Sequence, residues 1–198
     1  MFKKKFGLTL ILILLFFFHK NSFSMEPNIF VQSTVNRASQ VLSDNITKEQ
    51  KMIKLREIAK DTVDIKGIGL YTLGKYRKNL NDNQKRKYSE LFHKYFLKSF
   101  SSRLSEYSNP KIDVNSHEKL NEKYTIVSST LQATNKRPEI KIDWRIYTKN
   151  PEKPLIRDLI IEGLSLARTL KEEFSSIIGN NDGDINALFS SLENFINN

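Results

Sequence analysis

The sequence predicts an α+β fold, an antiparallel four-stranded sheet with helices packed on one face. Apolar residues recur every three or four positions before Pro110 and again after Leu166, which is the period of a helix with one buried face. Between these limits they alternate with polar residues, as in a strand exposed on one face. Short turn-forming segments at 135–138 and 150–154 separate the later strands, so neighbouring strands are expected to pair antiparallel.

Capping signals mark two of the four helices expected in the N-terminal half. Thr47 with Gln50, and Asn81 with Gln84, have the three-residue spacing of a capping box. The second pair opens the longest helix, which Asn109-Pro110 ends because a residue before proline avoids the helical region. By default its aromatic stripe is core packed against a sheet, although its density in Phe and Tyr also permits a ligand cavity. The stripe consists of Tyr88, Leu91, Phe92, Tyr95, Phe96, Phe100, Leu104 and Tyr107.

The period of the apolar residues changes after the proline. In the third expected strand, isoleucines and one tryptophan alternate with charged residues, which predicts one buried and one solvated face. The helical period then returns in two segments that a glycine-containing break separates, 169–178 and 184–197. The four expected strands are 111–114, 123–134, 140–147 and 155–166.

Residues 1–24 are interpreted as a cleaved secretory signal peptide. Three lysines at positions 3–5 precede an uncharged apolar run at 6–18, and Ser22 and Ser24 supply the small residues of a cleavage site. The apolar run spans about 20 Å as a helix, less than the roughly 30 Å core of a bilayer. An uncleaved membrane anchor is the alternative interpretation.

The mature chain, residues 25–198, is expected to be soluble and to form a single domain. We divide this domain into a helical half at 29–108, a sheet at 111–166 and C-terminal helices at 167–197.

Composition argues against several classes of partner and chemistry. The chain has no cysteine, which rules out disulfides, thiolate metal sites and a cysteine nucleophile. Its net charge is +10, but four of its lysines lie in residues 1–24. In the mature chain basic and acidic residues are largely interleaved, so no nucleic acid is expected as a partner.

Motifs for catalysis are incomplete in this sequence. Residues 69–75 match the Gly-x4-Gly-Lys part of a phosphate-binding loop, but Tyr76 stands where magnesium coordination needs Ser or Thr, so no nucleotide is expected. The mature chain has only two histidines, His93 and His117, and no Gly-x-Ser-x-Gly motif. We therefore expect no metal, no cofactor and no enzymatic activity.

Segments in order along the chain resemble the MlaC, or toluene-tolerance auxiliary, family of periplasmic phospholipid-binding proteins. The resemblance covers about residues 31–195, with Tyr76 where the family often has Trp and Lys171 where Arg is usual. The segments are 64–78, the aromatic helix up to residue 107, Ile142-Asp143-Trp144-Arg145, and 158–166 leading to Glu173-Phe174 and Ile177-Ile178.

The resemblance implies a soluble periplasmic phospholipid carrier with an apolar cavity between its helices and its sheet. Such a carrier passes lipid between an outer-membrane lipoprotein complex and an inner-membrane ABC transporter and so maintains outer-membrane lipid asymmetry. Alternatives are a carrier of another apolar ligand such as a hopanoid or a quinone, a ligand-free periplasmic interaction module, and a divergent hydrolase. The residues expected to line the cavity are Ile68, Tyr71, Tyr76, Phe92, Phe96, Phe100, Ile142, Trp144, Ile146, Leu159 and Ile161.

Overall fold

A computed structural model describes residues 24–135 and 137–198 of the chain. The expected signal peptide, residues 1–24, lies outside the described residues except for Ser24 and stays a prediction. In the described part, no helix combines the length and the hydropathy needed to cross a bilayer.

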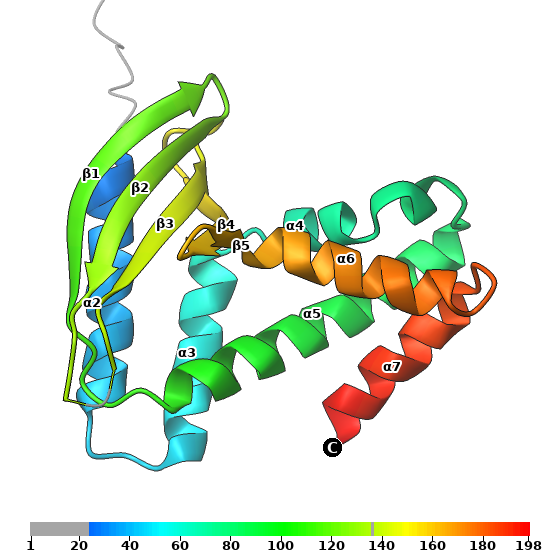
Figure 1. Cartoon of the computed structure of the whole chain (residues 1–198), viewed down its shortest axis with the longest axis horizontal. Helices are drawn as coiled ribbons and strands as arrows, with labels where there is room; N and C mark the ends of the chain where they lie inside the picture. The colour runs from blue at the N-terminus through cyan, green and yellow to red at the C-terminus, as the bar shows by residue number, and fades with distance from the viewer. Residues whose placement is uncertain (1–23, 136) are drawn as a thin grey trace, which may run out of the picture.

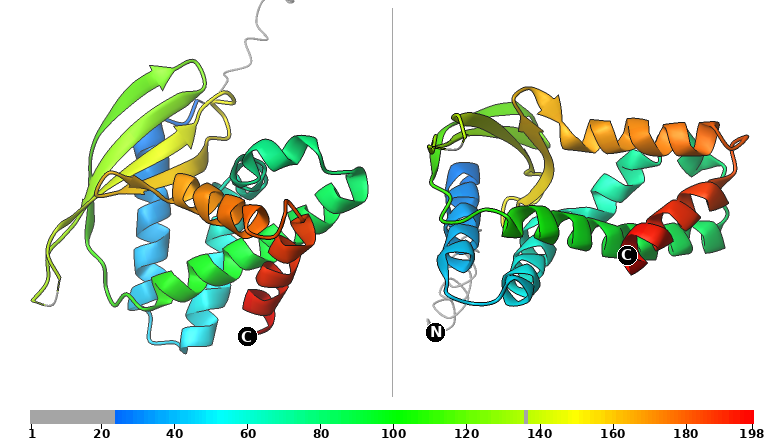
Figure 2. Two further views of the ribbon diagram at one scale, coloured as in Figure 1. Left: turned by 45° about the vertical axis from the view of Figure 1, so that its right-hand side comes forward. Right: turned by 60° about the horizontal axis from the view of Figure 1, so that its bottom comes forward.

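The molecule consists of a curved antiparallel sheet and two groups of helices (Figures 1 and 2). Helix α2 lies across the concave side of the sheet and contacts β1 and β2, whereas α4 and α6 contact β4. The helices are α2 (Pro27–Ser43), α3 (Lys48–Thr62), α4 (Ile65–Thr72), the 3-10 helix η2 (Gly74–Lys78), α5 (Asp82–Ser105), α6 (Leu166–Gly179) and α7 (Ile185–Asn197). The strands are β1 (Ile112–Asn121), β2 (Tyr124–Leu131), β3 (Ile140–Tyr147), β4 (Leu155–Ile161) and β5 (Leu164–Ser165).

Both expected capping boxes are confirmed. The Gln50 amide N–H donates to Thr47 Oγ1 at 3.2 Å, and the Thr47 N–H donates to Gln50 Oε1 at 3.0 Å. Asn81 and Gln84 make the same reciprocal pair, at 2.9 Å and 3.0 Å. Each box satisfies two backbone donors that a helix start leaves without partners, and so fixes where α3 and α5 begin.

The α+β class and the antiparallel sheet are also confirmed, but the prediction of four strands is wrong. The sheet has five strands in the order β1-β2-β3-β4-β5. The expected last strand, 155–166, is divided because Glu162 (φ 49°) and Gly163 (φ 81°) form a tight turn that reverses the chain. Two consecutive residues with positive φ are typical of a two-residue hairpin turn, so Leu164 and Ser165 pair back onto β4 as β5.

Strand β1 extends well beyond the expected 111–114. The sequence prediction relied on alternating apolar residues, and the second half of the strand has no such alternation. Residues 115–121 are all exposed at the edge of the sheet, yet they pair with β2 as far as Asn121. Polar edge strands are typical of soluble sheets, because polar side chains discourage pairing with other molecules.

The aromatic stripe of α5 packs mainly on helices rather than on the sheet. This helix contacts α3, α4 and α7. Tyr88 and Phe92 are buried near its start, and Phe92 meets Phe174 of α6 edge to face, with ring centroids 6.2 Å apart. Further along, Phe96 and Phe100 are only partly buried. The second half of the stripe therefore has a different environment from the first.

Candidate functional site

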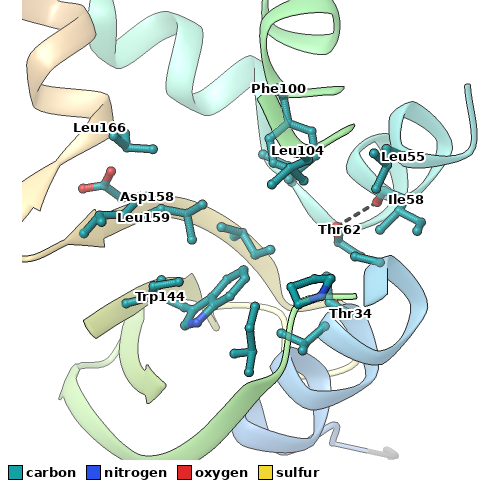
Figure 3. A pocket seen from close by; sticks show the side chains of 18 of the residues that line it. Thr34, Leu55, Ile58, Thr62, Phe100, Leu104, Trp144, Asp158, Leu159 and Leu166 are labelled. Atoms are coloured by element: carbon teal, nitrogen blue, oxygen red, sulfur yellow. Dashed lines mark hydrogen bonds between the residues drawn. The ribbon is translucent and has the colours of Figure 1, made fainter. Parts of the chain in front are cut away.

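A pocket of about 200 Å³ lies between the concave side of the sheet and helices α2, α3, α5 and α6. In Figure 3, Phe100 and Leu104 of α5 lie on one side of the pocket, and Leu159 and Trp144 of the sheet lie on the other. The helices α2 and α3 complete the wall with Thr34, Val35, Ala38, Ser39, Leu42, Leu55, Ile58 and Thr62.

The pocket lies where the hydrophobic core is interrupted. The larger core cluster joins the sheet to α4, α5, α6 and α7 and also includes Phe30, Val31 and Val35 of α2 and Ala59 of α3. A separate small cluster consists of Val41, Leu42, Leu55 and Ile58, with Ala38, Leu104 and Tyr107 packed against it. Residues of both clusters line the pocket, which therefore occupies the space between them. A domain usually has one contiguous core with smaller satellites under long loops, whereas here the satellite lies on regular helices.

The sheet presents a continuous apolar surface to the pocket because β4 carries a bulge. Ile156 of β4 pairs with Ile146 of β3, and Leu159 pairs with Trp144, so β4 has one residue more than β3 between these pairs. In a regular strand, residues three positions apart, as Ile156 and Leu159 are, would point to opposite faces. The bulge thus brings both to the pocket wall.

Helix α4 is fixed to the sheet at its N-cap residue, Asp64. The Asp64 N–H donates to the carbonyl of Ile156 at 2.9 Å, and the Asp64 carboxylate accepts from the N–H of Gly67 at 2.8 Å and pairs with Arg157. This anchor directs Ile68, one turn further on, to the pocket wall.

Four polar side chains of the wall, from Thr34, Ser39, Thr62 and Trp144, donate to protein partners. The hydroxyls of Thr34, Ser39 and Thr62 donate to backbone carbonyls at 2.9, 3.2 and 2.8 Å. The indole N–H of Trp144 donates to Ser129 Oγ at 2.8 Å. These bonds leave the carbon surfaces of the side chains toward the pocket, so the wall favours an apolar ligand.

Asp158 is the acidic residue in the wall, and it is 5% exposed. Its carboxylate accepts from Ser165 Oγ at 2.6 Å and from the Ala167 N–H at 3.0 Å, and an Arg145 nitrogen lies 3.9 Å away. Asp158 therefore holds β5 and the start of α6 against β4 and is not available to a ligand.

The structure brings seven of the expected residues together at this pocket. They are Ile68, Phe96, Phe100, Ile142, Trp144, Leu159 and Ile161.

The other four expected residues lie elsewhere. Tyr71 is 43% exposed, with the Lys171 ammonium 5.4 Å from its ring centroid. Tyr76 packs against the larger core cluster, and Ile146 is fully buried in it. Phe92 lines a separate surface depression between α4 and the start of α5.

Sequence reasoning missed the contribution of α2 and α3 to the wall. The helical spacing of Val35, Ala38 and Leu42 in α2, and of Leu55 and Ala59 in α3, signals a buried face on each helix. That signal does not distinguish a residue facing a neighbouring side chain from one facing a pocket.

Two comparisons with known proteins agree with this fold. The solved structure of a phospholipid-binding protein from Ralstonia solanacearum, in complex with a phospholipid, superposes with a TM-score of 0.74 at 18% sequence identity. The match covers 87% of this chain and 97% of that chain. The family model described as MlaC protein matches residues 32–194. The match extends over most of the sequence, and the chain therefore belongs to the MlaC family.

Proposed function

We propose that the protein is a soluble periplasmic phospholipid carrier whose helices and sheet enclose the acyl chains in the pocket. The observation that carries this proposal is the apolar pocket that divides the core into two clusters. Membership of the MlaC family and the phospholipid bound to the Ralstonia protein support the same ligand class.

The free energy of lipid exposure explains why a carrier is needed. At about 0.8 kcal/mol per CH₂, two acyl chains of roughly 15 carbons each cost on the order of 20 kcal/mol to expose to water. A phospholipid therefore leaves a membrane only if another apolar surface receives its tails. The pocket wall supplies such a surface.

The pocket widens when a lipid enters. A cavity of about 150 Å³ accommodates benzene, which has six carbons, so on this scale about 200 Å³ accommodates roughly eight carbons. A single acyl chain of a membrane lipid is longer than this. Part of each tail therefore needs space that Phe96, Phe100 and Leu170, which are only partly buried, make available by moving.

The same proposal assigns the protein a route and a cellular location. The signal peptide exports the chain to the periplasm, where it passes lipid between an outer-membrane lipoprotein complex and an inner-membrane ABC transporter. The transporter supplies the energy and the direction of transfer, so the carrier needs no cofactor and no catalytic residue. This exchange maintains the lipid asymmetry of the outer membrane.

Two measurements test the lipid-binding step. Organic extraction of the purified protein followed by mass spectrometry identifies co-purified lipid, and a phospholipid is the expected result. Trp144, the only tryptophan of the chain, lines the pocket, so phospholipid with brominated acyl chains should quench its fluorescence by contact. A hopanoid or a quinone in the extract would show that the protein carries that class of lipid instead of phospholipid. An empty extract without quenching would refute carriage and favour a ligand-free module or a hydrolase.

A further inference from the structure

We propose that Arg137 binds the phosphate group of the lipid whose tails occupy the pocket, an inference that rests on the proposed function. The wall itself carries no positive charge for a phosphate, since the residues that line it include no lysine or arginine, and its one carboxylate, Asp158, is bonded to Ser165 and Ala167. A phosphate contact must therefore come from beside the pocket.

Arg137 contacts one residue of the pocket wall. Its guanidinium carbon is 4.3 Å from the ring centroid of Tyr107, and Tyr107 lines the pocket just after the end of α5. This contact joins the β2–β3 connection to the segment that leaves α5. A positive charge thus lies in direct contact with a residue that lines the pocket.

The backbone holds Arg137 in this position. The Thr134 N–H donates to the Arg137 carbonyl at 2.8 Å, and the Arg137 N–H donates to the Thr134 carbonyl at 3.2 Å. The Arg137 side chain is half-buried against Tyr107. An arginine that is already ordered loses less conformational entropy on binding a ligand than a free surface arginine does.

The charge of Arg137 is not neutralised by a carboxylate. Within residues 24–135 and 137–198, the ion pairs with oxygen within 4.0 Å involve Arg37, Arg145, Arg157 and several lysines, but not Arg137. Its guanidinium carbon lies over the Tyr107 ring. The N–H groups of a guanidinium form a planar fork that fits the two free oxygens of a phosphodiester.

Two parts of the protein therefore recognise different parts of the lipid. The apolar wall accepts acyl chains without regard to the head group, whereas Arg137 selects lipids that carry a phosphate. A diacylglycerol with the same tails tests this division, because it lacks only the phosphate and the group attached to it.

The experiment measures quenching of Trp144 by phosphatidylglycerol and by diacylglycerol, both with brominated acyl chains. Arg137→Gln should weaken phosphatidylglycerol binding roughly tenfold, as expected for one charged hydrogen-bonded contact, and leave diacylglycerol binding unchanged. Arg137→Lys, which keeps the charge but not the fork, should give an intermediate affinity. Arg77→Gln is the matched control, because Arg77 is an exposed arginine on η2 outside the pocket wall.

The outcomes separate this inference from the proposed function. Equal affinity of Arg137→Gln and wild type for phosphatidylglycerol would overturn the phosphate contact and leave lipid carriage intact. An equal loss for both lipids would also overturn it, because Arg137 would then only fasten the β2–β3 connection to Tyr107. Failure of the wild type to bind either lipid would overturn the proposed function and this inference with it.

Discussion

Replacing Ala38 by phenylalanine should fill the pocket from the α2 side. Ala38 is half-buried and lines the pocket, and it packs against the small cluster of Leu42, Leu55 and Ile58. The substitution adds one phenyl ring at a position where no polar group loses a partner. It tests directly whether the pocket is where the acyl chains bind.

The expected loss of binding follows from the size of the ring. Since benzene fits a cavity of about 150 Å³, the added ring would occupy about three quarters of a pocket of about 200 Å³. It excludes about six carbons of acyl chain, which at about 0.8 kcal/mol each correspond to about 5 kcal/mol of binding free energy. Affinity for phospholipid should therefore fall by roughly three to four orders of magnitude.

Folding should survive this substitution, because the ring enters existing space. Any residual overpacking should cost no more than about 3 kcal/mol. Ala187→Phe is the matched control: Ala187 is a half-buried helical alanine on α7 that lies outside the pocket wall.

The assay compares the lipid recovered by extraction and the quenching of Trp144 for the two variants, with thermal unfolding as a check of folding. A folded Ala38→Phe protein that retains the wild-type amount of lipid would refute this location for the tails. An equal loss in Ala187→Phe would show that the effect is not specific to the pocket.

Three further predictions concern the pocket wall, the turn before β5 and the buried Tyr88. Ile142→Trp and Phe96→Trp should each lower the yield of co-purified lipid, measured by mass spectrometry, in a domain that still unfolds cooperatively; an unchanged yield would count against this wall. Gly163→Ala should lower the free energy of unfolding by about 1 kcal/mol in a denaturant titration, because φ is +81° there and an added Cβ meets nothing within 4 Å; an unchanged value would mean that the turn relaxes. Burial raises the pKa of Tyr88 above its usual range, and the hydrogen bond with Thr72 offsets this only in part. An unfolded tyrosine ionises near pH ~10, so stability should be lost as the pH rises above that value, and less steeply in Tyr88→Phe; equal slopes in the two proteins would contradict this assignment.

Local signals in the sequence were sufficient for most elements of the fold. The pairs Thr47 with Gln50 and Asn81 with Gln84 determine helix starts through hydrogen bonds between residues three positions apart, which no distant contact needs to support. The alternation in β3 likewise depends only on which face is buried. These features were predictable because the interaction that decides them is visible within a few residues.

The remaining features depend on residues far apart in the sequence. The turn at Glu162 and Gly163 lies inside an apolar stretch, and only its pairing back onto β4 reveals a fifth strand. The bulge in β4 arises from its register with β3, which no pattern within β4 discloses. The contribution of α2 and α3 to the pocket wall also depends on distant residues. A buried stripe on a helix does not reveal whether it faces another side chain or a pocket.

A divided core has a consequence for stability as well as for binding. The side chains of the two clusters, among them Leu42 and Leu104 on one side and Trp144 and Leu159 on the other, lack contacts across the pocket that a filled core would provide. Acyl chains would supply these contacts and so join the clusters. A ligand that binds only the folded state stabilises it by about 2.7 kcal/mol at a hundredfold excess over its dissociation constant. The lipid-free protein should therefore unfold at a lower temperature than the loaded one in calorimetry, and Ala38→Phe should abolish that difference because its ring occupies the place of the lipid. If lipid stabilised wild type and Ala38→Phe equally, it would bind outside this pocket.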